Sequence, residues 1–146
     1  MQRMIVRSRV YIDMDNVLCD FRKAWLDARK KEPHVDFPQS KYGFFLNLEP
    51  MRGAIQAVNE LILYHDVWIL TAPSVMNPLC YTEKRLWIEK HFGIEMCYRL
   101  IISPDKSLFY GDYLIDDIDH DFAGTHIKFG SSEFPDWESV KKTLLK

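Results

Sequence analysis

Two carboxylates stand at the end of an apolar run near the start of the chain. In the stretch "VYIDMDNVLCD" (10–20), Asp13 and Asp15 follow three apolar residues and are separated by one methionine. A buried carboxylate without a partner is costly, so acids at the end of a buried strand require a compensating charge. In an extended chain, residues i and i+2 point to the same side, so both carboxylates can face one site.

A polar residue follows three further apolar runs in the same way. The residues are Thr71 after "VWIL" (67–70), Lys106 in the loop beyond "LII" (100–102), and Asp116 and Asp117 after "YLI" (113–115). Ligands of open α/β sheets bind outside the carboxyl ends of the strands, so these distant residues are predicted to meet. Each alone is typical of a helix cap or a surface charge; their joint order favours a site.

The residue types suit the hydrolysis of a phosphate monoester. A carboxylate can attack phosphorus and form an aspartyl-phosphate, provided that repulsion between the two anions is cancelled. A divalent cation and a lysine can cancel it. Clustered aspartates match the oxygen ligands that Mg²⁺ prefers, whereas Zn²⁺ prefers His and Cys. The second carboxylate, Asp15, can act as general acid and then as general base on water.

The elements that must position these residues alternate between strand and helix. The four apolar runs, with a fifth at "HIKF" (126–129), predict five strands. Helical spacing recurs in "MRGAIQAVNELILY" (51–64) and in "YTEKRLWIEKHFG" (81–93), which stops at a glycine. A closing helix is predicted in "FPDWESVKKTLLK" (134–146), with Asp136 as N-cap. This alternation predicts an α/β fold, a Rossmann-like three-layer sandwich whose mostly parallel, five-stranded sheet is covered on both faces.

One segment interrupts the alternation. Residues 20–50 hold a helix-like piece, "FRKAWLDARKK", followed by the aromatic, proline-punctuated "EPHVDFPQSKYGFFLNLEP". The segment is too long for a simple crossover and too apolar for a solvated loop. We expect a small helical cap, inserted into a single domain that spans residues 1–146.

Composition limits the classes of partner. The formal net charge is −2, which gives no electrostatic reason to expect binding to a nucleic-acid polymer or to an anionic membrane. No apolar run approaches the length of a membrane span, and "MQRMIVRSRVYID" (1–13) lacks the features of a signal peptide. Three cysteines without C-x-x-C spacing favour the reducing cytoplasm over a disulfide framework or a zinc site. None of the five histidines shows ligand spacing, so none receives a role.

The motifs resemble those of the haloacid dehalogenase superfamily of phosphohydrolases. "DMDNV" is similar to its first motif, "LTAP" to its second, Lys106 in "SPDKS" to its third and "LIDD" to its fourth. Within that superfamily, the blocks "DMDNVLCDF", "FFLNLEP", "YTEKRLWIEKHFG", "DKSLFYGDYLIDD" and "DWESV" resemble the 5′(3′)-deoxyribonucleotidase family. The blocks span most of the chain and keep the order of that family.

The resemblance implies a strand order and a set of roles. Numbered along the chain, the strands would lie in the order 5-4-1-2-3. Asp13 would be the nucleophile and Asp15 the general acid and base. Mg²⁺ would bind Asp13, the carbonyl of Asp15 and Asp117, with Asp116 acting through water. The phosphate would contact Thr71, the backbone N–H of Ala72 and Lys106. The substrate pocket would include Phe21, with Phe44 and Phe45 serving either substrate stacking or cap packing.

The chain departs from the family pattern at two places. Asn16 stands where glycine is usual, and asparagine tolerates left-handed backbone better than other residues with a side chain. The cap segment is shorter than in the animal enzymes, which predicts weaker discrimination among bases.

The expected substrate is a deoxyribonucleoside monophosphate, and a homodimer is compatible with the sequence. The alternatives are a phosphatase of another small metabolite, a catalytically silent binding domain and a receiver-like signalling domain. The last is disfavoured because the Asp-Asp pair comes after the lysine.

Overall fold

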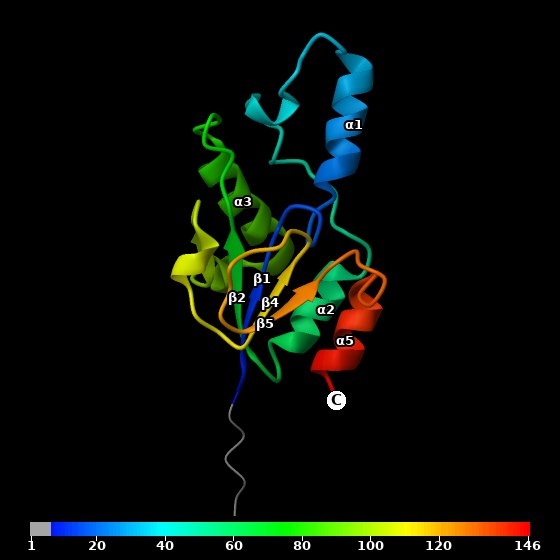
Figure 1. Cartoon of the computed structure of the whole chain (residues 1–146). Coiled ribbons are helices and arrows are strands. Elements are labelled where there is room, and N and C mark those ends of the chain that lie inside the picture. Colours follow the sequence, from blue (N-terminus) through cyan, green and yellow to red (C-terminus); the bar gives the residue numbers. More distant parts are fainter. Residues whose placement is uncertain (1–6) are drawn as a thin grey trace, which may run out of the picture.

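A computed structural model describes residues 7–146; residues 1–6, part of the stretch examined for a signal peptide, lie outside the described residues. The five strands form one parallel sheet in the order β3-β2-β1-β4-β5 (Figure 1), which confirms the order predicted from the resemblance. The strands are β1 (Arg9–Ile12), β2 (Asp66–Thr71), β3 (Leu100–Ile102), β4 (Tyr113–Asp116) and β5 (Thr125–Lys128). The helices are α1 (Phe21–Lys31), α2 (Ala54–Leu61), α3 (Cys80–Phe92), α4 (Ile94–Cys97) and α5 (Trp137–Leu144), with 3₁₀ turns η1 (Pro38–Ser40) and η2 (Lys106–Leu108).

The first strand occupies the centre of the sheet. Its Val10, Tyr11 and Ile12 are almost fully buried, as expected for a strand covered on both faces. Ile12 lies in register with Ile69 of β2 and Ile115 of β4. The carboxyl ends of these three neighbouring strands are therefore level with one another, which brings the polar residues that follow them to one edge.

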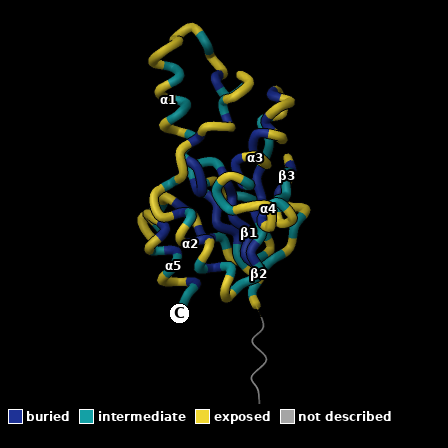
Figure 2. The backbone as a smooth tube through the Cα atoms, turned by 180° about the vertical axis from the view of Figure 1, so that it is seen from behind, coloured by how far each residue is buried: buried dark blue, intermediate teal, exposed yellow. Residues whose placement is uncertain are grey.

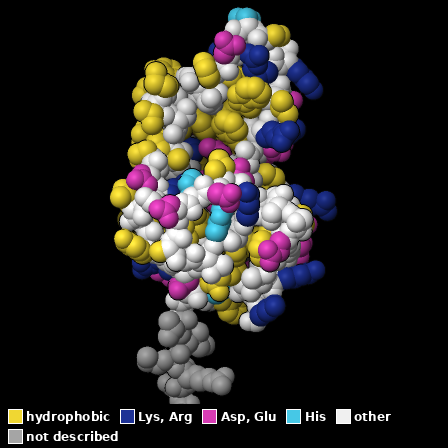
Figure 3. All heavy atoms as spheres, in the orientation of Figure 1, with side chains coloured by type: hydrophobic (Ala, Val, Ile, Leu, Met, Phe, Trp, Pro, Cys, Tyr) yellow, Lys and Arg dark blue, Asp and Glu magenta, His cyan; other side chains and the backbone are white. Residues whose placement is uncertain are grey.

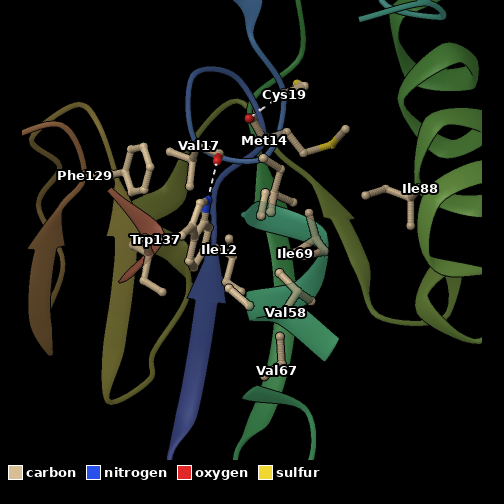
Figure 4. Packing of buried hydrophobic residues seen from close by; sticks show 14 of the residues in the cluster. Ile12, Met14, Val17, Cys19, Val58, Val67, Ile69, Ile88, Phe129 and Trp137 are labelled. Atoms are coloured by element: carbon tan, nitrogen blue, oxygen red, sulfur yellow. Dashed lines mark hydrogen bonds between the residues drawn. The ribbon is translucent and has the colours of Figure 1, made fainter. Parts of the chain in front are cut away.

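Long helices cover one face of the sheet. Side chains from α2, α3 and α5 join strand residues such as Ile12 and Ile69 in the main core. Figure 4 shows Trp137 of α5 reaching the turn after β1, where its indole N–H donates to the carbonyl of Val17 at 2.8 Å. The predicted start of α5 is confirmed, because Asp136 accepts the N–H of Ser139 and forms a capping box.

The opposite face of the sheet is covered mainly by loops. Its smaller cluster combines Tyr11, Leu70 and Leu114 with Phe109 and Phe122, which come from connections rather than from long helices. The chain crosses back over the sheet after β3, and a right-handed crossover in that direction must pass over this face. The connections 103–112 and 117–124 are short, so the third layer contains loops and the turn η2 instead of helices.

The segment 20–50 projects beyond the carboxyl ends of the strands (Figure 1). Helix α1 contributes no buried residue, and Figure 2 shows it far from α2 and α5 with only exposed and intermediate residues. The later part of the segment is tied to the region around α3. The buried amide of Asn77 donates to the carbonyls of Gln39 and Lys41, and Trp87 donates to that of Leu48.

Within residues 7–146, no helix combines the length and the apolar character needed to cross a membrane.

Candidate active site

The strand ends surround a cavity of about 260 Å³. Its lining comes from the loops after β1, β2 and β4 and from the starts of α1 and η2. The lining residues are Asp13, Asp15, Asn16, Phe21, Ala72, Lys106, Asp116, Asp117, Ile118 and His120. In Figure 3, histidine and acidic side chains gather below the apolar surface of the upper part of the molecule. Seven of the ten residues predicted for the site line this cavity; Thr71 lies behind it, and Phe44 and Phe45 do not line it.

A buried lysine joins two of the aspartates. The ammonium of Lys106 donates to Asp13 Oδ1 at 2.7 Å and to Asp116 Oδ2 at 2.6 Å. Burial alone would lower the pKa of Lys106, but the charges of the two carboxylates raise it. Burial raises the pKa of Asp13 well above its usual range, and Lys106 opposes that shift. The lysine thus supplies one positive charge where two buried acids need compensation.

The acidic cluster suits a divalent cation. Carboxylate oxygens of Asp13, Asp116 and Asp117 lie within 4.8 Å of one another. Oδ1 of Asp117 is buried and accepts no hydrogen bond from the described residues. Burial raises the pKa of Asp117, as it does that of Asp13. An oxygen with no donor, beside other acids, offers what a hard cation binds, so these residues fit the predicted metal.

The second carboxylate of the first motif is held by a different lysine. Lys84 of α3 donates to Asp15 Oδ2 at 3.0 Å, to Thr71 Oγ1 at 2.5 Å and to the carbonyl of Ala72 at 2.8 Å. The thiol of Cys19 lies 3.6 Å from Asp15 Oδ1. Both oxygens of Asp15 therefore have a neighbour that can donate, and the loops after β1 and β2 share one ammonium.

The turn after β1 accommodates asparagine in the expected way. Asn16 has a φ of 64°, the left-handed region that glycine would occupy most easily. Its side-chain oxygen accepts the backbone N–H of Arg22, and its own N–H donates to the carbonyl of Cys19. The carbonyl of Met14 accepts three successive N–H groups, from Val17, Leu18 and Cys19. This closed turn, anchored on Trp137 in Figure 4, holds the first motif rigidly.

The three phenylalanines form a cluster, but only one reaches the cavity. Phe21 packs against Phe44 and Phe45, with ring centroids 5.4 and 6.0 Å away. Phe21 lines the cavity, whereas Phe45 is buried and its ring lies 5.3 Å from the ammonium of Lys84. Phe44 is partly buried against the main core. Phe45 occupies a packing position in the segment 20–50, and the role of each ring in substrate binding stays a prediction.

Comparisons with known proteins agree with the motifs. Residues 30–138 match the model of the family described as 5′ nucleotidase, deoxy (Pyrimidine), cytosolic type C protein. A protein of Vibrio phage KVP40 named "Putative 5′(3′)-deoxyribonucleotidase" is 41% identical over an alignment 152 positions long, which covers 96% of this chain and 89% of the phage protein. The chain belongs to this nucleotidase family.

Two further comparisons are more distant. The human 5′(3′)-deoxyribonucleotidase of cytosolic type is 35% identical over an alignment 163 positions long, which covers 90% of this chain and 78% of the human one. A solved structure titled "putative haloacid dehalogenase-like hydrolase", from Burkholderia xenovorans, aligns over 77% of this chain and 73% of its own, with 17% identity and a TM-score of 0.41. The latter likeness is too distant to inform on the site. The family resemblance stated from the motifs is confirmed, and with it membership of a family of phosphoric monoester hydrolases.

Sequence reasoning missed two side chains of this nucleotidase-like site. Lys84 lies on the buried stripe of α3 with Cys80, Trp87 and Ile88, at i+4 from Cys80 and i−4 from Ile88. A lysine at helical spacing with Cys80 and Ile88 was the available signal, because a buried ammonium needs acceptors. His120 gave no comparable signal. It lines the cavity, and its Nε2 lies 3.1 Å from Asp116 Oδ2.

Proposed function

We propose that this chain is a Mg²⁺-dependent phosphatase that releases phosphate from deoxyribonucleoside monophosphates through an aspartyl-phosphate. Membership of the nucleotidase family supports the reaction class. The observation that carries the proposal is the position of Asp13, which lines the cavity and shares Lys106 with Asp116. A carboxylate in this setting can attack phosphorus while a neighbouring cation offsets the charge of the substrate.

The covalent step uses the two carboxylates of the first motif. An oxygen of Asp13 forms a bond to phosphorus, and the bond between phosphorus and the leaving oxygen breaks. Asp15 gives a proton to that oxygen, so the nucleoside leaves as an alcohol. In the second step Asp15 takes a proton from water, the water oxygen bonds to phosphorus, and the aspartyl-phosphate bond breaks. Inorganic phosphate is released, and Asp13 returns as a carboxylate.

The metal would be held by Asp13, Asp117 and the backbone carbonyl of Asp15, with Asp116 contributing through water. A bound Mg²⁺ supplies positive charge that stabilises the transferring phosphoryl group. The buried, unpartnered Oδ1 of Asp117 supports its assignment as a direct ligand. Asp116 is already engaged by Lys106, by His120 and by the N–H of Ile118, which supports its indirect role.

Three donors would form hydrogen bonds to the phosphate: the hydroxyl of Thr71, the N–H of Ala72 and the ammonium of Lys106. Ala72 and Lys106 both line the cavity. Thr71 is fully buried behind it, and its oxygen accepts a hydrogen bond from Lys84. The hydroxyl of Thr71 has a long contact of 3.5 Å to the carbonyl of Ala72, and its proton would have to turn from that carbonyl to the phosphate.

The nucleoside is proposed to lie between Phe21 and the rim of the cavity. A volume of about 260 Å³ is below the range of about 300–1,000 Å³ typical of small-molecule pockets. The phosphate and sugar would fill the cavity and leave the base at its mouth. One aromatic face is worth roughly 1–3 kcal/mol per stacked base. We therefore propose weak discrimination among bases, with the segment 20–50 acting as a small cap.

Phosphate release from a panel of substrates tests this proposal. The panel contains deoxyribonucleoside and ribonucleoside 5′- and 3′-monophosphates and sugar phosphates, each assayed with Mg²⁺. We expect a preference for deoxyribonucleotides that falls in Phe21→Ala. Phe37→Ala is the matched control, because Phe37 is an exposed ring of the same segment that does not line the cavity. Equal rates on sugar phosphates, unchanged in Phe21→Ala, would favour a phosphatase of another small metabolite, the second candidate that the small cavity allows.

We also propose a cellular compartment and an oligomeric state for the enzyme. All three cysteines are free thiols, two of them buried, which supports a reducing cytoplasm. Exposed aromatic residues of the segment 20–50, Phe37 and Tyr42, could pack in a homodimer. Light scattering of the purified protein would give its oligomeric state.

A further inference from the structure

Lys84 is a buried charge that the proposed mechanism leaves without a role. Its side chain is 1% exposed, and its ammonium donates all three of its protons: to Asp15, to Thr71 and to the carbonyl of Ala72. These acceptors lie at the carboxyl ends of two neighbouring strands: Asp15 in the loop after β1, Thr71 at the end of β2 and Ala72 directly after it. Lys84 does not line the cavity, so it acts on these residues from behind.

The contacts restrain two side chains, that of Asp15, which lines the cavity, and that of Thr71, which is buried behind it. Lys84 holds Oδ2 of Asp15, while the thiol of Cys19 lies next to Oδ1. Rotation of the Asp15 carboxylate would break the hydrogen bond from a buried ammonium, which is costly because that charge would lose an acceptor. At Thr71, the hydroxyl oxygen accepts the hydrogen bond from Lys84, and the hydroxyl itself lies 3.5 Å from the carbonyl of Ala72. That second contact is longer than a normal O–H···O hydrogen bond, so a bound phosphate could take the proton instead.

Packing holds the lysine itself in place. The ring of Phe45 lies 5.3 Å from the ammonium, and the preceding residue of α3, Glu83, accepts the N–H of Gly43. Both contacts come from the segment 20–50. Buried ion pairs add little stability compared with well-packed apolar residues of similar volume. A purely structural reading therefore does not account for an ammonium on this stripe of α3.

We propose that Lys84 is a positioning residue that keeps the Asp15 carboxyl aimed at the leaving-group oxygen and the Thr71 hydroxyl aimed at the phosphate. This inference rests on the proposed function, since it assigns the supporting contact for the general acid of that reaction. It implies that loss of Lys84 harms the transfer of a proton to the leaving group more than it harms attack on phosphorus.

Two leaving groups separate these effects. A nucleoside leaves as a poorly stabilised alkoxide and needs the proton from Asp15, whereas p-nitrophenolate leaves without one. In Lys84→Met we expect kcat on a deoxyribonucleoside monophosphate to fall about 30–100-fold. This is at or below the lower limit of the roughly 10²–10⁴-fold that general acid catalysis supplies, because Asp15 itself remains. We expect KM to change by less than about 3-fold, because the phosphate contacts of Lys106 and Ala72 remain.

The same variant should retain the aryl phosphate reaction. The burst of p-nitrophenolate in a rapid-mixing experiment reports only the formation of the aspartyl-phosphate, and its rate should fall less than about 5-fold. Lys90→Met is the matched control, since Lys90 is exposed on the same helix. It should match the wild type on both substrates.

The outcomes are distinct. Equal losses on the two substrates would make Lys84 a structural residue and overturn the proposal, as would wild-type kcat in Lys84→Met. If thermal melting shows that Lys84→Met does not fold, Lys84→Gln, whose amide can still donate to Asp15, undergoes the same comparison. Failure of both variants to fold would also overturn the proposal. A wild-type protein without activity on any deoxyribonucleotide would instead contradict the proposed function.

Discussion

Charged residues gather at both ends of the sheet, but basic side chains outnumber acidic ones at the amino end and acidic ones outnumber basic ones at the carboxyl end. At the amino end, Asp66 is flanked by Arg9 at 3.1 Å and Arg99 at 2.6 Å, and the indole of Trp68 also donates to it. Burial alone would raise the pKa of Asp66, but these donors lower it. At the carboxyl end, burial dominates, and the pKa values of Asp13 and Asp117 are raised.

The difference indicates that the acid at the amino end stabilises the fold, whereas the acids at the carboxyl end destabilise it. A carboxyl whose pKa is lowered on folding stabilises the native state at neutral pH, and one whose pKa is raised destabilises it. The amino end therefore contributes to folding. The carboxyl end concentrates four aspartates around two lysines, an arrangement that a bound cation and a phosphate can use. The following predictions test this contrast.

The largest expected effect is at Asp13. Asp13→Asn removes the nucleophile and should abolish release of phosphate from an aryl phosphate. The same variant, measured in EDTA, should melt at a higher temperature than the wild type. A buried ionised acid is removed, while Lys106 retains its ion pair with Asp116. Measurable turnover, or a melting temperature below that of the wild type, would contradict our interpretation of this end of the sheet.

Metal removal is the second prediction. Excess EDTA should abolish activity, and adding back Mg²⁺ should restore it. At about 100 times its dissociation constant, the cation should stabilise the fold by about 2.7 kcal/mol, seen as a rise in melting temperature. The rise should be lost in Asp117→Asn and kept in Asp66→Asn, at the other end of the sheet. Full activity in EDTA would contradict the metal assignment.

Lys106 gives the third prediction. Lys106→Ala removes a charge-assisted contact to a dianion and should cost about 2–4 kcal/mol of transition-state stabilisation, measured as the loss in kcat/KM. The exposed Lys90 serves again as control. A decrease of less than about tenfold, equivalent to about 1.4 kcal/mol, would place Lys106 outside the reaction.

Local pattern was enough to predict the strand ends. Asp13, Asp116 and Asp117 each follow a short apolar run, and the rule that ligands bind at the carboxyl ends of parallel strands converts that pattern into a common location. The cavity that these residues line has the place and the acidic character that were expected. The strand order came from the family resemblance instead, because the apolar runs alone do not specify which strands pair.

The remaining features depend on tertiary packing. Helical spacing places Lys84 with the buried residues of α3, but its acceptors can be identified only once α3 packs behind the strand ends. Phe45 is buried because the segment 20–50 folds onto α3, a contact that no local pattern encodes. The loop-covered face follows from the direction of the crossover after β3, which the chain specifies only once the strand order is known.

The smallest expected effect is at the amino end of the sheet. Asp66→Asn should leave kcat/KM unchanged and lower the free energy of unfolding by about 1 kcal/mol at pH 7, since its arginine partners are half exposed and such pairs are weak. Unfolded, this carboxyl titrates near its ordinary pKa of about 3.9. The native pKa is lower, so the stabilising contribution is complete above the unfolded value and disappears as the pH falls through the native one. Urea titrations of both proteins at pH 7, 5 and 3.5 should therefore show a constant difference at the two higher values and a smaller one at the lowest. A difference that grows towards acid would mean that Asp66 destabilises the fold, and the contrast between the two ends of the sheet would fail.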